Sequence, residues 1–98
     1  MKVVINDEFG TFQLSKKALE LFGARAGKSP RGLFGEHWRY APEFRASQIL
    51  LDIVEELGQD AADYAAHFKV VEIPDGIPWH IANPEGPEYV ARDHETWR

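Results

Sequence analysis

The chain has 98 residues and a net charge of −5, and a domain of this size holds one modest hydrophobic core. The negative charge argues against a protein that coats bulk duplex nucleic acid, because that role requires a broad basic face. The absence of cysteine excludes disulfides, thiolate nucleophiles and cysteine-ligated zinc, and no apolar run approaches the roughly 18 residues of a membrane span.

The first part of the chain predicts a β-hairpin followed by a helix. Residues 2–6 contain three consecutive β-branched residues, typical of a buried strand, and residues 6–10 have the composition of a turn. Phe12 and Leu14 alternate with polar residues, so the spacing predicts that residues 11–14 pair back onto the first strand. Ser15 is suited to be the N-cap of a helix over residues 16–26, which Gly23 or Gly27 would end.

The rest of the chain predicts further helices and then strands. Residues 28–41 are irregular, with short strand pieces at 33–34 and 37–40, and a long amphipathic helix is predicted from Pro42 to Gly58 because apolar residues recur at spacings of three and four. Asp60 predicts a second cap and a short helix to about His67. Residues 68–73, 79–81 and 88–92 are predicted strands separated by turns, and residues 93–98 a short tail.

These elements predict a single α+β domain over residues 1–98. Its antiparallel sheet would consist of the N-terminal hairpin and a C-terminal three-stranded meander, packed by one long helix and one or two shorter helices. The twelve aromatic residues are numerous for this length, and large aromatics often serve both a core and an interface, so we expect a homo-oligomer.

Charge is distributed unevenly along the chain. Residues 16–45 have a net charge of +4, whereas residues 46–98 have −8. Such a separation suggests an anion-facing surface on an otherwise acidic protein. Guanidinium groups bind phosphate oxygens, and aromatic rings stack on nucleobases, so this stretch supplies the candidate ligand-binding residues Arg31, Trp38, Arg39, Tyr40 and Arg45. The alternative is a surface loop whose aromatic side chains pack on the sheet while its arginines meet neighbouring carboxylates.

Other chemistries have weaker signals in the sequence. Residues 23–29 resemble a phosphate-binding loop, but the spacing between the glycines is one residue short and a helix precedes it, which leaves Lys28 as a lesser anion-binding candidate. The four histidines lack the spacing of a metal site, and no serine lies in a nucleophile motif. We therefore expect a protein that is not an enzyme and that has no metal and no cofactor.

Both ends of the sequence and its middle resemble a family of small, mostly uncharacterised bacteriophage and prophage proteins. The resemblance lies in MKVVIN at residues 1–6, in DIVEELG at 52–58, in KVVEIPDG at 69–76 and in Thr96–Trp97, whereas residues 27–47 depart from the family pattern. It implies a viral accessory protein in the host bacterial cytoplasm. By analogy with other small phage proteins, it implies a counter-defence factor.

Two binding functions and an enzyme remain open at this stage. In the first, the protein sequesters a small anionic nucleotide, a host signalling molecule: Arg31, Arg39 and Arg45 contact phosphates, Trp38 and Tyr40 stack on bases, and Lys28, Trp97 or Arg98 complete the site. In the second, the protein inhibits a host protein, and its acidic half covers a basic surface. An enzyme that acts on nucleotides is the third.

Overall fold

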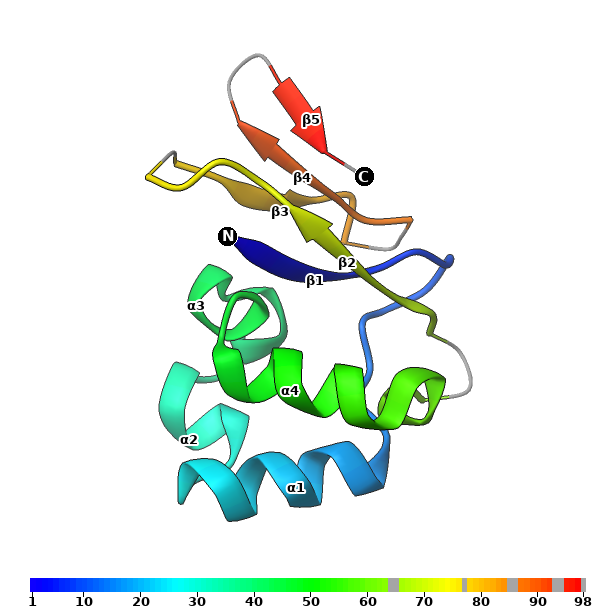
Figure 1. Ribbon diagram of the computed structural model, residues 1–98, viewed down its shortest axis with the longest axis vertical. Coiled ribbons are helices and arrows are strands. Elements are labelled where there is room, and N and C mark those ends of the chain that lie inside the picture. Colours follow the sequence, from blue (N-terminus) through cyan, green and yellow to red (C-terminus); the bar gives the residue numbers. More distant parts are fainter. Residues whose placement is uncertain (64–65, 77, 85–86, 93–94, 98) are drawn as a thin grey trace.

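The computed structural model describes residues 1–63, 66–76, 78–84, 87–92 and 95–97, which form one α+β unit (Figure 1). In chain order, the elements are β1 (Lys2–Asn6), α1 (Lys16–Ala26), α2 (Pro30–Phe34), the 3₁₀-helix η1 (Trp38–Tyr40), α3 (Pro42–Arg45), α4 (Gln48–Leu57), the 3₁₀-helix η2 (Gly58–Ala61), β2 (Phe68–Glu72), β3 (His80–Ala82), β4 (Tyr89–Arg92) and β5 (Glu95–Trp97).

The β1–β2 ladder lies between the helices and a second sheet (Figure 1). The two strands are antiparallel, with Val4 opposite Val70, and β3, β4 and β5 form a separate antiparallel sheet. Since side chains alternate along a strand, Val4 and Phe68 point toward the helices and join a cluster with Phe44 and Leu50. On the opposite face, Val3, Ile5 and Val71 pack with Val90 of β4 in a second cluster.

The predicted N-terminal hairpin is wrong. β1 pairs with β2, more than 60 residues later, and Leu14 makes only an isolated bridge to Ala62. The Asn6 side chain directs the chain out of the sheet, because its Nδ2 donates to the carbonyls of Glu8 and Gly10 (3.2 and 3.1 Å). Phe12 then enters the core and stacks on Phe68 with ring centroids 4.6 Å apart. The predicted meander also shifts by one strand, because β2 belongs to the first sheet and residues 95–97, predicted as tail, form β5.

The helix predicted over residues 16–26 is confirmed. Ser15 Oγ accepts a hydrogen bond from Ala18 N at 3.2 Å, and Gly27 ends the helix with φ +80°, a conformation that favours glycine. The long helix predicted from Pro42 to Gly58 is two helices, α3 and α4. Ser47 separates them and caps the second by accepting from Leu50 N at 3.2 Å.

Two further predictions in this part of the chain are also wrong. Residues 30–34 and 38–40 are helical rather than strand pieces. Ser29 caps the first of these helices, because its side chain accepts a hydrogen bond from Gly32 N. Of the short helix predicted from Asp60 to about His67, only its start is helical, in the 3₁₀-helix η2, which ends at Ala61. Residues 62, 63, 66 and 67 are not helical, and residues 64–65 lie outside the described residues. Among the described residues, no helix has the length and apolar character needed to cross a bilayer.

Candidate functional site

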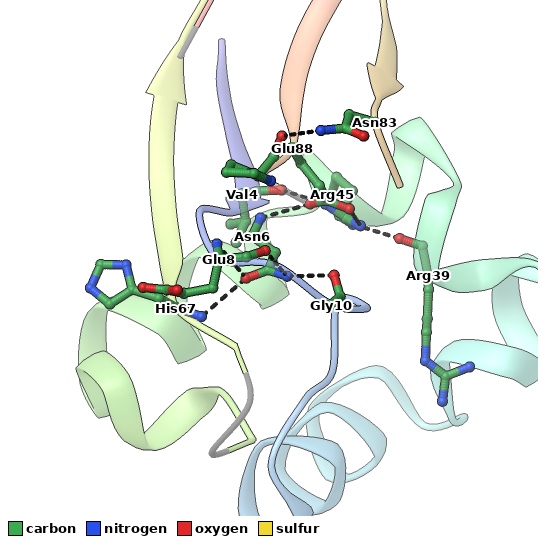
Figure 2. Close-up of polar contacts among 10 residues, drawn as sticks. Val4, Asn6, Glu8, Gly10, Arg39, Arg45, His67, Asn83 and Glu88 are labelled. Carbon is green, nitrogen blue, oxygen red and sulfur yellow. Dashed lines mark hydrogen bonds and ion pairs between the residues drawn. The ribbon is translucent and has the colours of Figure 1, made fainter. Parts of the chain in front are cut away.

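Arg45 forms a fully buried ion pair with Glu88, and neither side chain is exposed to solvent (Figure 2). Arg45 Nη1 donates to Glu88 Oε1 at 2.7 Å, and Nη2 donates to Oε2 at 2.9 Å, so the two planar groups meet in a bidentate pair. Arg45 Nε donates to the carbonyl of Arg39, and the guanidinium lies 3.6 Å from the centre of the Phe12 ring. Since burial of a charge is costly unless it is paired, this geometry fixes both residues in a structural role.

The same pair also forms hydrogen bonds with backbone groups on the edge of β1 that faces away from β2. Arg45 Nη1 also donates to the Val4 carbonyl at 3.1 Å, and Glu88 Oε1 accepts from Asn6 N at 2.6 Å (Figure 2). Glu88 N donates to the Asn6 carbonyl at 2.8 Å. Two side chains and the backbone N–H of Glu88 therefore take the place that a further strand would occupy beside β1. The sequence-based assignment of Arg45 to a phosphate contact is corrected accordingly, because no face of its guanidinium reaches solvent.

Trp38 is also part of the core. Its side chain is 6% exposed and meets Phe44 edge to face, with centroids 5.1 Å apart. A base cannot stack on a ring in this position without displacing the core, so the predicted stacking role of Trp38 is wrong for this conformation. The alternative expectation was a surface loop whose aromatic side chains pack on the sheet while its arginines meet carboxylates. It describes the Arg45–Glu88 pair, whereas Trp38 lies in a 3₁₀-helix and packs on Phe44 of α3.

Arg39 remains near the surface beside Trp38. Its guanidinium lies 4.5 Å from the centre of the Trp38 ring and points away from the Arg45–Glu88 pair (Figure 2). Its Nε is buried and has no hydrogen-bond partner among the described residues. Tyr40 is 36% exposed, and Lys28 and Arg31 are exposed beside and on α2. Trp97 is placed only by its backbone in β5, opposite Val90, and Arg98 lies outside the described residues.

A groove of about 680 Å³ lies elsewhere, between α4 and the β1–β2 ladder. Its apolar lining is Met1, Ala46, Leu51, Val54 and Val70, and its polar lining is Lys2, Gln48 and Glu55. None of the predicted ligand-binding residues whose side chains the structure describes lines it. Val70 points to the helix side of the ladder, because it stands opposite Val4, yet it is 42% exposed. The groove thus offers apolar surface that α4 does not cover.

Among the described residues, carboxylates outnumber cations around this groove. Glu55 lines it, Asp52 accepts a hydrogen bond at 2.8 Å from the lining residue Gln48, and Glu72 stands opposite Lys2 in the ladder. The amino terminus is paired with Asp75 at 2.8 Å and does not offset this charge. On the other side of α4, Glu56 pairs with Arg25 of α1, and the hydrogen bond to Glu56 raises the pKa of Arg25.

The groove was not predicted from the sequence because the predicted meander pairs residues 68–73 with the strand at 79–81, whereas β2 pairs with β1. A weak signal was present, since residues 46–68 contain no lysine or arginine and four of their five carboxylates fall on α4 and η2. No cluster of three or more potential metal ligands occurs among the described residues. Comparisons with models of protein families, with curated proteins and with solved structures find no significant match to this chain.

Proposed function

We propose that this protein is a non-enzymatic binding protein that covers a basic surface of another protein, using the groove between α4 and the β1–β2 ladder. One observation carries the proposal: the groove combines uncovered apolar side chains with a surplus of carboxylates at its rim. Apolar surface contributes roughly 25 cal/mol per Å² when it leaves water, and the surrounding charge selects the partner.

The exposed charge of α4 and η2 supports a basic partner. Asp52, Glu55, Glu56 and Asp60 are all exposed, and only Glu56 has an arginine partner among the described residues. Clustered charge of one sign steers an oppositely charged protein and accelerates its association, an effect that salt screens. The resemblance to small phage proteins supplies the expectation that the partner belongs to a bacterial host.

Matched leucine variants test the proposal. The wild-type protein is immobilised and exposed to bacterial lysate, and the retained protein is identified and purified. Leu51→Glu places a charge in the groove and should weaken binding of that purified partner at least tenfold, which corresponds to about 1.4 kcal/mol. Leu33→Glu makes the same change at an exposed leucine of α2 outside the groove and should leave binding unchanged.

Two results would count against this function. One is equal binding of the partner by wild type and Leu51→Glu. The other is an affinity that does not fall as salt is raised from about 50 to 300 mM, because charge complementarity between exposed groups requires that dependence.

Nucleotide sequestration is the second candidate. The Nε of Arg39, which has no hydrogen-bond partner in the part of the chain that the structure describes, favours it. With Trp38 and Arg45 in the core, this site would consist of Arg39 with Tyr40, Arg31 and Lys28 on the surface. Isothermal titration with linear and cyclic nucleotides tests it: heat that Arg39→Gln abolishes supports this candidate. Heat without chemical change of the nucleotide, checked by chromatography, separates it from an enzyme.

A further inference from the structure

The outer edge of β2 has backbone groups that no strand of the described residues uses. Met1 and Ile73 exchange two hydrogen bonds (2.9 and 2.8 Å), and Asp7 N donates to the His67 carbonyl at 2.7 Å. Since bonded pairs alternate in an antiparallel ladder, residues 69 and 71 also bond to β1, and the amides of residues 68, 70 and 72 point away from it. Within the described part of the chain, β2 has no strand on that side.

This edge runs along the groove. Val70 belongs to both, because its backbone points outward at the edge while its side chain lines the groove on the helix side. Gln59 Nε2 donates to the Phe68 carbonyl at 3.4 Å and occupies only one end of the edge. A strand laid against Val70 and Glu72 would direct every second side chain toward α4.

Resting on the proposed function, we propose that β2 accepts an extended segment of the partner protein as an additional strand. Main-chain hydrogen bonds to Val70 and Glu72 supply affinity, and side chains at alternate positions supply specificity. An apolar residue of the segment lies beside Val70 and packs on Leu51 and Val54. A lysine or arginine two positions away lies beside Glu72 and within reach of Glu55. Lys2 is the one basic side chain next to these two carboxylates in the described part of the chain.

The charges favour this occupant over a second copy of the chain. A symmetric pairing of two β2 edges about Val70 sets Lys69 opposite Val71 and Phe68 opposite Glu72, so it forms no ion pair across the new ladder. It also brings together two grooves with the same carboxylate surplus, on chains that each have a net charge of −5. A basic strand from another protein can form ion pairs with the carboxylates of the groove and does not add to the negative charge there.

Substitutions at Val70 separate the backbone from the side chain. Val70→Pro removes an N–H that points away from β1, so the β1–β2 ladder keeps its bonds. Val70→Thr keeps the N–H and the approximate shape. The probe is a random 12-residue peptide library displayed on phage and selected on the immobilised full-length protein, followed by fluorescence anisotropy with the enriched synthetic peptide.

We expect enriched peptides with lysine or arginine and β-branched residues on a period of two. Binding of the synthetic peptide should fall at least tenfold in Val70→Pro and stay close to wild type in Val70→Thr. Amide hydrogen exchange in the wild-type protein provides a readout that does not depend on the folding of a variant. The peptide should slow amide exchange at Val70 and Glu72 and leave the exchange rate of the Leu33 amide unchanged.

Three outcomes would overturn strand addition. The first is equal peptide binding by folded Val70→Pro and Val70→Thr, or no slowing of exchange at Val70 and Glu72. The second is enrichment of peptides with apolar residues at helical spacings of three and four. The third is a wild-type dimer in sedimentation that Val70→Pro dissociates, which would identify a second copy as the occupant.

If Leu51→Glu abolishes partner binding while Val70→Pro does not, the proposed function of the groove stands and strand addition falls. If neither variant has an effect, both fall.

Discussion

Arg45 occupies a position in the fold that its surroundings in the sequence do not reveal. It belongs to a basic stretch, yet its guanidinium is buried against Phe12, and its partner Glu88 lies 43 residues further along. A sequence shows that an arginine is present but not which distant carboxylate will meet it. Trp38 is similar, because its fate depends on Phe44 packing across its edge. Both residues were therefore assigned to a surface site, although each lies in the core.

We expect Glu88→Gln to lower the free energy of unfolding by about 3–5 kcal/mol, because it leaves the buried charge of Arg45 without a counter-charge. Urea unfolding measures this change. Glu56→Gln is the matched control, since it removes an exposed carboxylate from its pairing with Arg25 and should leave the midpoint close to wild type.

A double variant, Arg45→Met with Glu88→Met, should be less destabilised than Glu88→Gln, because no unpaired charge remains. It will not reach wild-type stability, since Asn6 N–H and the Val4 carbonyl lose their partners. A double variant that is as unstable as the single variant would mean that the ion pair contributes through backbone satisfaction alone.

At the scale of elements, local signals predicted local structure. For α1, the cap Ser15, the apolar spacing and Gly27 all lie within the helix or next to it, and its bounds follow from them. The apolar spacing of residues 44–57 continues across the break at Ser47, so the same kind of signal joined α3 and α4 into one helix. The β1–β2 pairing was missed because Lys2 and Glu72 are 70 positions apart, and an adjacent segment was the nearer partner.

The break at Ser47 has a testable energetic role. Ser47→Ala removes the side-chain acceptor for Leu50 N and should cost about 1 kcal/mol, within a range of about 0.5–2. For a domain of this size, that corresponds to a fall in melting temperature of about 4–8 °C. Ser47→Asp keeps a capping oxygen and should melt close to wild type. Equal melting temperatures for the two variants would show that the hydroxyl does not stabilise α4.

For the whole molecule, some of the oppositely charged residues from the two parts of the sequence pair with each other in the fold. The two ion pairs between side chains in the described part of the chain, Arg25–Glu56 and Arg45–Glu88, each join the basic stretch to the acidic half. Arg25 and Arg45 are therefore not free to face an anion. The acidic side of α4 and η2 remains exposed beside the groove and the open edge of β2.

The central position of β1 predicts that both hydrophobic clusters unfold together. Val4 packs with the helices while Val3 and Ile5 pack with the second sheet, so neither cluster persists when β1 leaves. Two single-tryptophan variants report on the two clusters, one retaining Trp38 and the other Trp79, with the remaining tryptophans replaced by phenylalanine. In each variant, the urea midpoint from fluorescence should equal the midpoint from far-UV circular dichroism. A Trp79 signal that changes at lower urea than the circular dichroism would show that the second sheet separates first, and that the ion pair of Glu88 does not couple the layers.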